Sequence, residues 1–260
     1  MKIAFYTFGC KVNQYETQAL RQQFAAQGWE VLEFDHQGGW DAVVVNSCTV
    51  TAEGDRKTRQ LLRRLRREHP GAAICLTGCF PQAFPGPASA IQEADVVTGS
   101  KDRRGLSDAL DRFLSTGERV VDIRPHQPGE GFEAIAPVRE FGRRTRAFVK
   151  IEDGCENFCA YCIIPTARGP VRSKPMAALQ SELEALARSG YQEVVLAGIN
   201  LSAYGREWGG RLIDAIGAAA ATRGLRRVRL GSLEPDVIGP EDFSRMAAAG
   251  KGGPQFHLSL

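Results

Sequence analysis

The sequence predicts an α/β fold in two parts, an N-terminal parallel-sheet three-layer domain followed by an incomplete (β/α) partial barrel. Two observations predict this fold. Short apolar runs alternate with longer helix-like stretches in both parts, and a segment rich in Pro and Gly, residues 124–144, lies between them. Strands that alternate with helices are typical of a parallel sheet covered by helices. The 260 residues are enough for two domains.

The N-terminal domain is expected over residues 1–123. Its expected strands are residues 2–8, 42–46, 72–78 and 94–99, and its expected helices are residues 14–27, 53–69 and 103–116. The first run, KIAFYTF, has a single Lys and no small-residue cleavage site behind it, which indicates a buried strand rather than a signal peptide. No segment approaches the ~20 apolar residues that a membrane span needs. We therefore expect a cytoplasmic protein with no membrane partner.

The second domain is expected over residues 145–260, after a linker at 124–144. Its expected strands are residues 147–154, 191–198, 227–232 and 255–260, and its expected helices are residues 176–189, 210–223 and 240–249. This repetition predicts a barrel or part of one. The last run, QFHLSL, alternates like a strand, and His257 within it is expected to be a packed polar residue. A barrel that stopped there would leave an open edge, so we expect a fragment truncated at its C-terminus.

The composition is that of an ordinary folded protein. Hydrophobic residues make up 43% of the chain and charged residues 24%, which argues against disordered and fibrous classes. The net charge is only +3, but the segment from Arg56 to His69 carries seven basic residues. The chain has seven cysteines and no export signal. Because cytosolic thiols stay reduced, these cysteines are expected to serve metals or catalysis rather than disulfides.

The most specific motif is GCENFCAYC, directly after a predicted strand, in which Cys155, Cys159 and Cys162 have the spacing C-x3-C-x2-C. Three thiolates this close can each bind one iron of a [4Fe–4S] cluster and leave the fourth iron open to a substrate or cofactor. The alternative is a structural zinc knuckle, for which a fourth Cys or His nearby is expected. The spacing and the position after the first barrel strand favour the cluster.

Three further cysteines each follow a predicted strand. Cys10 ends FYTFGC, Cys48 ends VVVNSC and Cys79 ends CLTGC. Because the carboxyl ends of neighbouring parallel strands meet at one crevice, we expect these three to form a second cluster site. The alternative is that buried cysteines only fill core space, and this is what we expect of Cys75, which lies inside a strand.

The C-x3-C-x2-C motif resembles that of the radical S-adenosylmethionine (SAM) superfamily. The two cysteine sets together resemble the methylthiotransferase family, over essentially the whole chain. In that family the N-terminal domain holds one cluster through three dispersed cysteines, and the next domain holds the radical-SAM cluster. The opening motif FGCKVNQYET, from Phe8 to Thr17, looks like the MtaB type, which acts on N6-threonylcarbamoyladenosine in tRNA.

The resemblance implies an enzyme, a transferase with two [4Fe–4S] clusters and SAM, that transfers a methylthio group to C2 of this adenosine at position 37. One SAM would give its methyl group to a sulfur held at the N-terminal cluster, and a second would be cleaved to the radical that abstracts the C2 hydrogen. An aromatic C–H bond lies beyond acid–base side chains, which agrees with a radical cofactor. The implied partners are tRNA, SAM and an electron donor such as a reductase or a flavodoxin-like protein. The oligomeric state is left open.

The resemblance also implies residues that contact SAM. Tyr161, directly before the third cysteine of the motif, is expected against the adenine. Gly198 and Asn200, in LAGINLSAYG at the end of the second barrel strand, are expected near the methionine amino group. Ser232 and Glu234, in LGSLEP, are expected to accept hydrogen bonds from the ribose. All lie at or near carboxyl ends of strands, where barrel sites form.

Arginines are the expected RNA and anion contacts. In CIIPTARGPVRSKP, which resembles the family segment after the cluster, Arg168 and Arg172 are expected to bind anions of substrate or cofactor. The alternative is that they are surface arginines beside a Gly-Pro turn. In the helix 53–69, Arg56, Arg59 and Arg63 share one stripe that could meet RNA phosphates, and a solvated helix face is the alternative.

Two other functions stay open on the sequence. The same chemistry could act on isopentenyladenosine in tRNA or on a ribosomal protein. The chain could also be a noncatalytic iron–sulfur or zinc protein that binds RNA.

Overall fold

The computed structural model describes residues 1–133, 138–139, 141, 145–234, 239–248, 250–252 and 256–258. The chain forms two compact units. Unit 1 comprises Met1–His126 and Phe158–Arg168, and unit 2 comprises Gln127–Asn157 and Gly169–Leu260. The predicted division into 1–123, a linker and 145–260 differs from these units mainly because the segment 158–168 packs with unit 1. Linker residues 134–137, 140 and 142–144 lie outside the described residues.

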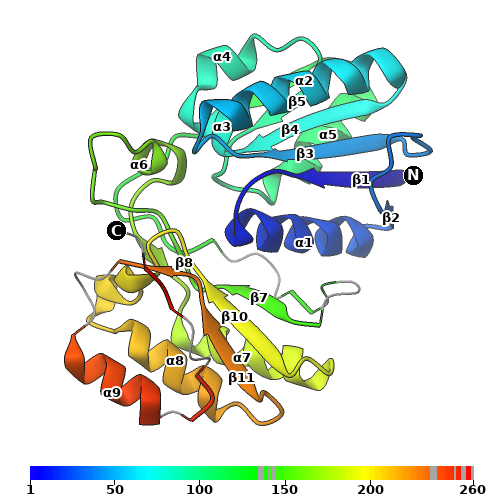
Figure 1. The fold of residues 1–260 in the computed structure, drawn as a ribbon. Helices are drawn as coiled ribbons and strands as arrows, with labels where there is room; N and C mark the ends of the chain where they lie inside the picture. Colours follow the sequence, from blue (N-terminus) through cyan, green and yellow to red (C-terminus); the bar gives the residue numbers. More distant parts are fainter. Residues whose placement is uncertain are drawn as a thin grey trace. The chain divides into compact units, whose positions relative to one another are not determined.

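Unit 1 is built on a parallel six-stranded sheet with the order β2-β1-β3-β4-β5-β6 (Figure 1). The strands are β1 (Lys2–Thr7), β2 (Glu30–Leu32), β3 (Ala42–Ser47), β4 (Ala73–Gly78), β5 (Val96–Thr98) and β6 (Val120–Asp122). Every residue of β3 and β4 is buried, as expected of central strands that are covered on both faces. The chain order switches direction between β1 and β3, because β2 lies on the outer side of β1.

Helices cover both faces of this sheet, which makes unit 1 three-layered. They are α1 (Lys11–Ala26), α2 (Ala52–Glu68), α3 (Cys79–Ala83), α4 (Pro85–Ser89), α5 (Gly105–Thr116) and α6 (Ile164–Arg168). Ile3 and Val44 pack with α1 and α5 on one face, whereas Ala4 and Val43 pack with α2, α3 and α4 on the other. Figure 1 shows α1 and α2 on opposite sides of the strands. Adjacent residues of a strand face opposite ways, so each strand contributes to both packed faces. The predicted α/β class with a parallel sheet is confirmed for unit 1.

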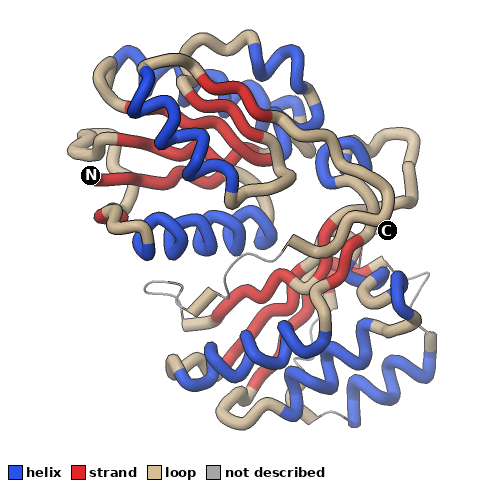
Figure 2. The backbone as a smooth tube through the Cα atoms, turned by 180° about the vertical axis from the view of Figure 1, so that it is seen from behind, coloured by secondary structure: helices blue, strands red, loops and turns tan. Residues whose placement is uncertain are grey.

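Unit 2 has a parallel three-stranded sheet with the order β11-β10-β7, formed by β7 (Ala147–Lys150), β10 (Glu193–Ala197) and β11 (Arg227–Leu230). Two small pairs accompany it: β8 (Glu152–Asp153) with β9 (Arg172–Ser173), and β12 (Ser232–Leu233) with β13 (His257–Leu258). The helices are α7 (Met176–Arg188), α8 (Leu212–Ala221) and α9 (Pro240–Ala248), with 3-10 turns η1 (Leu201–Ala203) and η2 (Arg206–Trp208) between β10 and α8. The three α-helices lie on one side of the strands (Figure 2), which confirms the α/β class of this unit.

Short elements are where the structure differs from the sequence-based expectation. The sequence does not predict β2, β6, α3 or α4, because elements of three to five residues carry too few positions to show a period. The strand expected over 147–154 ends at Lys150, and Glu152–Asp153 pairs separately as β8. His257 is exposed, so the expectation that it is packed is wrong. Residues 249, 255, 259 and 260 of the expected last elements lie outside the described residues.

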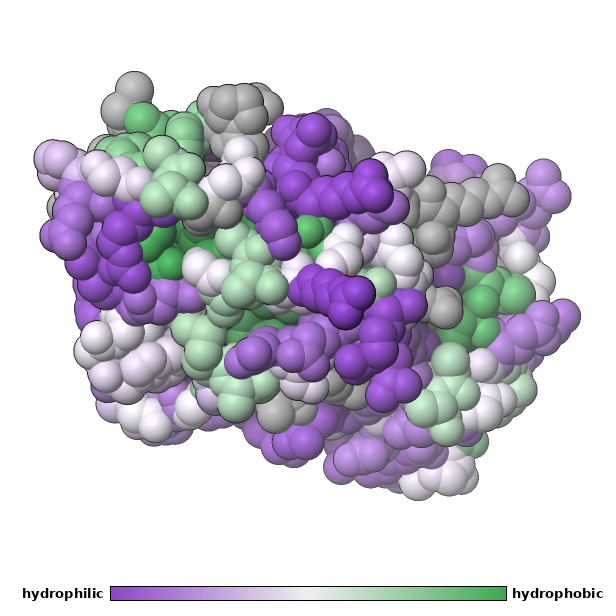
Figure 3. Space-filling view, turned by 90° about the horizontal axis from the view of Figure 1, so that it is seen from below, coloured by the Kyte–Doolittle hydropathy of each residue, from purple (hydrophilic) through white to green (hydrophobic). Residues whose placement is uncertain are grey.

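The surface is mixed in character. The face seen in Figure 3 carries many hydrophilic side chains, with smaller groups of apolar ones between them. Within the ranges that the structure describes, no helix combines the length and the apolar character needed to cross a membrane.

Candidate functional site

Three cysteines of unit 1 lie just beyond the carboxyl ends of adjacent strands. Cys10 follows β1 and is the N-cap of α1, Cys48 follows β3, and Cys79 follows β4 and is the first residue of α3. Because β1, β3 and β4 are neighbours in the sheet, the structure brings all three cysteines to one edge. This edge includes the switch point between β1 and β3, where open α/β sheets bind their ligands.

Two glycines shape the turns that present these cysteines. Gly9 and Gly78 both have φ of +99°, a left-handed conformation that favours glycine. A Cβ atom at Gly9 would lie 2.8 Å from the Cβ atom of Cys48 and 3.1 Å from its Sγ atom. The turn before Cys10 therefore lies directly against the Cys48 side chain, which is possible only because Gly9 has no side chain.

Asn13, on the first turn of α1, is hydrogen-bonded to Cys10, to the segment before Cys48 and to Arg168. It is buried. Its Nδ2 donates to the carbonyl of Ser47, directly before Cys48, at 2.9 Å. Its Oδ1 accepts from the Cys10 thiol at 3.5 Å and from Arg168 Nη2 at 2.6 Å. One amide thus connects the turns after β1 and β3 with a guanidinium group that contacts Cys79.

Arg168, the last residue of α6, is fully buried beside Cys79. Its Nε donates to Cys79 Sγ at 3.2 Å, and its Nη1 forms an ion pair with Glu16 Oε1 at 2.6 Å. The other oxygen of Glu16 pairs with Arg103 Nη2 at 2.8 Å. Two buried guanidinium groups therefore flank one buried carboxylate under the cysteine-bearing edge. We call Arg168, Glu16, Arg103 and Asn13 the polar cluster of unit 1.

The polar cluster influences the thiols electrostatically. Burial raises the pKa of Cys79, while the nearby Arg168 cation lowers it and the Glu16 carboxylate raises it. Burial also raises the pKa of Cys48, and the Cys79 thiol and Arg168 act on it in opposite directions. Thiolates are the form that binds iron. A positive charge at Arg168 therefore opposes the cost of burying thiolates here.

Cys75 behaves as the sequence predicts. It is fully buried in β4 and packs in the core with side chains from α1 and α5. Burial raises the pKa of its thiol strongly. Among the described residues, no group of three or more His, Cys, Asp or Glu side chains is arranged to hold a single metal ion. Ligands of a [4Fe–4S] cluster need not meet at one atom, since each cysteine binds a different iron.

The C-x3-C-x2-C motif is divided between the units. Cys155 belongs to unit 2, and Cys159 and Cys162 belong to the segment 158–168 of unit 1. The backbone N–H of Cys155 donates to the carbonyl of Gly169 at 3.0 Å, and that of Cys162 donates to the carbonyl of Cys159 at 2.9 Å. Tyr161 is 92% exposed, so its expected contact with an adenine stays a prediction.

Glu152 is a buried carboxylate beside the predicted SAM-binding residues of unit 2. Its Oε2 accepts the backbone N–H of Asn200 at 2.7 Å, and a Cβ atom at Gly198 would lie 2.6 Å from the same oxygen. Asn200 Nδ2 also donates to Cys155 Sγ at 3.7 Å. Among the described residues, Glu152 Oε1 and Asn200 Oδ1 have no hydrogen-bond partner. Burial and the adjacent Asp153 raise the pKa of Glu152 well above its ordinary value.

The end of the third barrel strand is held by local hydrogen bonds. Ser202 Oγ donates to the carbonyl of Glu234 at 3.1 Å and accepts from the backbone N–H of Glu234 at 2.9 Å. Ser232 is exposed. The structure therefore gives Glu234 a backbone contact, while the hydrogen bonds expected from Ser232 and Glu234 to a ribose stay predictions.

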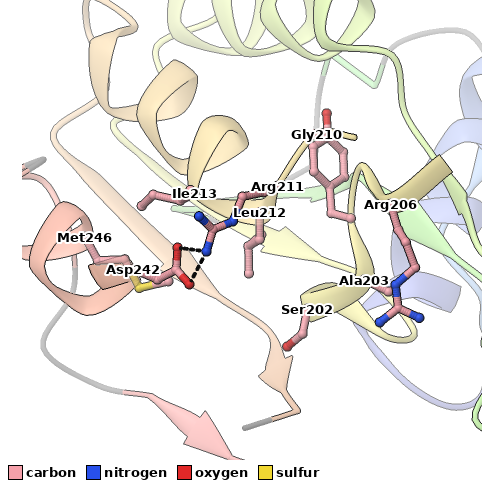
Figure 4. Close-up of a pocket in the computed structure, with 10 residues that line it drawn as sticks. Ser202, Ala203, Arg206, Gly210, Arg211, Leu212, Ile213, Asp242 and Met246 are labelled. Atoms are coloured by element: carbon pink, nitrogen blue, oxygen red, sulfur yellow. Dashed lines mark hydrogen bonds and ion pairs between the residues drawn. The ribbon is translucent and has the colours of Figure 1, made fainter. Parts of the chain in front are cut away.

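A pocket elsewhere in unit 2 holds none of the predicted site residues. It is lined by side chains from η1, from the start of α8 and from α9, and within it Arg211 Nη2 reaches both carboxylate oxygens of Asp242 at 2.7 Å (Figure 4). Arg211 and Asp242 are therefore already paired with each other.

The other predicted arginines already have partners. Arg172 is buried and pairs with Glu130 at 2.9 Å and with Asp153 at 3.4 Å, so it is not the surface arginine of the alternative interpretation, and neither is Arg168. Anion binding by the two stays a prediction.

The stripe of arginines on α2 is engaged in local contacts. Arg56 pairs with Glu53 at 2.6 Å, Arg63 lies 3.6 Å from Glu93, and the guanidinium carbon of Arg59 lies 5.1 Å from the centre of the Phe80 ring. Arg56 and Arg63 are exposed, at 58% and 69% of their side chains. RNA binding by this stripe stays a prediction.

Sequence reasoning from cysteine spacing misses Asn13, Glu16, Arg103 and Glu152. Two signals could have found some of them. Asn13 and Glu16 are polar residues three apart on the face of α1 that also carries the buried Val12, Ala19 and Leu20, and Glu152 follows a run of apolar residues in a predicted strand. Polar groups in such positions need a partner or a ligand.

Comparison with known proteins gives one match to part of the chain and further matches to all or nearly all of it. Residues 2–99 match the family model described as "Uncharacterized protein family UPF0004". The whole chain is similar to the threonylcarbamoyladenosine tRNA methylthiotransferase MtaB of Bacillus subtilis (strain 168), with 37% identity over 99% of this chain and 57% of the relative. It is also similar to the MtaB protein of Aquifex aeolicus (strain VF5), with 35% identity over all of this chain and 63% of the relative.

A solved structure agrees on the fold. The radical S-adenosylmethionine methyltransferase TsrM from Kitasatospora setae, with tryptophan substrate and a SAM analog bound, matches 99% of this chain and 59% of its own, with a TM-score of 0.67 and 16% identity. The fold of this chain is therefore similar to the fold of that TsrM structure. By sequence, the chain is similar over nearly its whole length to proteins named as methylthiotransferases, as its motifs predict. It spans about 57% to 63% of the length of these two relatives.

Proposed function

We propose that this chain is the part of a radical-SAM methylthiotransferase that transfers a methylthio group to C2 of N6-threonylcarbamoyladenosine at position 37 of tRNA. The observation that carries the proposal is the convergence of Cys10, Cys48 and Cys79 at the carboxyl ends of three adjacent strands, in a chain that also carries a C-x3-C-x2-C motif. The similarity to relatives named for this reaction supports it.

The residues present fit two [4Fe–4S] clusters and SAM. Cys10, Cys48 and Cys79 would hold one cluster, where the turn at Gly9 lies against Cys48 and a buried guanidinium group donates to Cys79. Cys155, Cys159 and Cys162 would hold the other. When bound, the clusters and SAM supply the electrons, the methyl group and the radical that protein side chains cannot supply.

The side chains of unit 2 would bind and orient SAM. Glu152 Oε1 and Asn200 Oδ1 are buried acceptors whose hydrogen-bonding capacity is not used within the described residues. An ammonium group is a donor of the complementary charge and would satisfy both. Gly198 lets the backbone pack directly against Glu152, because a Cβ atom there would lie 2.6 Å from Glu152 Oε2. Tyr161 would cover the adenine. The burial of this region would also exclude water from reactive groups.

The proposed partners follow from this reaction. The tRNA anticodon region would supply the adenosine, and the exposed Arg56 and Arg63, with Arg59 between them, would contact phosphates in a salt-dependent way. Arg168 and Arg172 are buried, so we propose structural support rather than a direct tRNA contact for them. An electron donor of the reductase or flavodoxin type and a cytoplasmic location complete the proposal.

The test measures iron and acid-labile sulfide per chain after anaerobic reconstitution. Wild type is expected to hold about eight irons, and the triple alanine variants of Cys10/Cys48/Cys79 and of Cys155/Cys159/Cys162 about four each. Cys75→Ala is the matched control, because this cysteine lies in β4, four residues before Cys79, and packs in the core. This variant should keep about eight irons. Four irons in wild type that vanish only with Cys155/Cys159/Cys162 would overturn the proposed reaction.

The substrate is tested separately on the same preparation, alone and together with the C-terminal remainder of a full-length relative. Mass spectrometry should detect a methylthio group on tRNA that carries N6-threonylcarbamoyladenosine. Modification of isopentenyladenosine tRNA or of a ribosomal protein instead would keep the chemistry and change the target. Bound zinc in place of iron, with no SAM cleavage under reducing conditions, would favour the noncatalytic alternative.

A further inference from the structure

Arg168 makes two kinds of contact at the N-terminal cysteine site. Its Nε–H points at Cys79 Sγ, 3.2 Å away, and its two terminal nitrogens bind Glu16 and Asn13. The side chain is fully buried, so solvent does not screen it. The donor is therefore fixed in direction, and its charge acts at close range on the Cys79 sulfur.

Glu16 holds the Arg168 guanidinium group in place and, together with Arg103, determines the net charge around it. Glu16 Oε1 accepts a hydrogen bond from Arg168 Nη1 at 2.6 Å, and Glu16 Oε2 forms an ion pair with Arg103 Nη2 at 2.8 Å. All three side chains are at most 1% exposed. Together they carry two positive charges and one negative charge, which leaves one net positive charge beside three candidate thiolate ligands. This sign is the one that stabilises an anionic cluster.

We propose that Arg168 is a positioning residue that sets the reduction potential of the cluster held by Cys10, Cys48 and Cys79. Its N–H bond to Cys79 Sγ and its positive charge raise this potential, and the Glu16 carboxylate lowers it. The inference rests on the proposed function, because it requires a cluster at these cysteines. The physical basis is general: hydrogen bonds to ligand sulfurs, net charge and burial all set the potentials of iron–sulfur clusters.

The experiment measures the midpoint potential of this cluster alone. The full chain carries Cys155→Ala/Cys159→Ala/Cys162→Ala, is reconstituted anaerobically, and is titrated with reductant while the absorption and electron paramagnetic resonance signals are recorded. Arg168→Gln removes the charge and should shift the potential to more negative values. Glu16→Gln removes the opposing charge and should shift it to more positive values.

Two further variants separate positioning from folding. Arg168→Lys keeps the charge but lacks the Nε–H donor, so its shift should be negative and smaller than that of Arg168→Gln. Arg172→Gln is the matched control, because Arg172 is also buried and pairs with Glu130 and Asp153. It should leave the potential unchanged.

The outcomes are distinguishable. Shifts of opposite sign for Arg168→Gln and Glu16→Gln support the inference, since general loosening of the fold would move both in the same direction. Shifts of one sign, or no shift, overturn it while the iron count still upholds the proposed function. If Glu16→Gln does not fold, the midpoint potential of Arg168→Lys decides. A negative shift of this potential supports the inference, and no shift overturns it. No iron in the triple-alanine background overturns the proposed function and this inference together.

Discussion

Glu16 in unit 1 and Glu152 in unit 2 are both fully buried carboxylates next to candidate sites, yet their surroundings differ. Glu16 has a guanidinium group on each oxygen. Glu152 accepts backbone N–H groups of Ile199 and Asn200, has Asp153 beside it, and has one oxygen without a hydrogen-bond partner within the described part of the chain. A compensated buried charge supports a framework, whereas an uncompensated one is costly until it binds a proton or a ligand. The comparison indicates that the candidate site of unit 1 is stabilised by ion pairs within the unit. In unit 2, Glu152 still has an oxygen that can accept a hydrogen bond from a bound group.

The largest expected effect is on the stability of unit 1 and concerns Glu16, the carboxylate that is paired with two guanidinium groups. Glu16→Ala leaves two buried guanidinium groups without their shared partner, so the free energy of unfolding of unit 1 should fall by about 3–5 kcal/mol. The measurement is urea unfolding followed by Trp fluorescence in a Trp208→Phe background, which leaves Trp29 and Trp40 as reporters of unit 1. Glu53→Ala, which breaks an exposed pair with Arg56 on α2, is the control and should leave the midpoint nearly unchanged. Equal effects of the two variants would break the comparison.

The second prediction concerns the uncompensated carboxylate and is a pH dependence. The folded state raises the pKa of Glu152 well above 4.5, so it holds this proton more tightly than the unfolded chain does. The stability is therefore fully present below about pH 4.5 and falls by about 1.4 kcal/mol per pH unit above it, until the raised pKa is passed. Glu152→Gln, which carries no titrating proton, should lack this fall and be more stable than wild type at neutral pH.

Unfolding of unit 2 at a series of pH values, followed by Trp208 fluorescence, measures this difference. Parallel pH profiles for wild type and Glu152→Gln would contradict the interpretation of Glu152 as an uncompensated buried acid. Saturating SAM should reduce the advantage of the Gln variant, since a bound ammonium group would favour the ionised carboxylate.

The smallest expected effect concerns the hydrogen bonds that connect Ser202 to the backbone of Glu234 in unit 2. Ser202→Ala removes both hydrogen bonds to the backbone of Glu234, and it should lower the free energy of unfolding by about 1 kcal/mol. Ser244→Ala removes one exposed bond to Pro240 within α9 and serves as the control. A loss as large as that of Glu16→Ala would mean that unit 2, too, depends on a compensated framework at its site.

Cysteine spacing and strand periodicity predict much of this molecule. The three-layer sheet follows from apolar runs such as 42–46 and 72–78, whose positions agree closely with β3 and β4. The convergence of Cys10, Cys48 and Cys79 follows from the rule that parallel strands end at a common edge. Both predictions rest on local pattern plus a topological rule, so neither requires knowledge of which distant residues touch.

The polar cluster could not be predicted, because it depends on contacts between residues far apart in sequence. Arg168 meets Glu16 across 152 positions, and nothing in the sequence around CIIPTARG indicates that this arginine is buried against the opening motif. The expectation that His257 is packed is wrong for a related reason, because the burial of a strand residue depends on which distant segments cover that strand. Short elements such as β2 lack enough residues for a period to appear.

The membership of residues 158–168 in unit 1 has a consequence for anyone who would separate or exchange the two parts. A protein cut after His126 would lack α6, and with it the cation that pairs with Glu16 and the Ala167 side chain that packs with Cys79. Such a piece would carry a buried carboxylate that has lost one of its two guanidinium partners, and a thiol that has lost a packing neighbour. The N-terminal part is thus not a module that can be excised or grafted at one junction. Any excised N-terminal part would also have to include the segment 158–168, which carries two cysteines of the second motif.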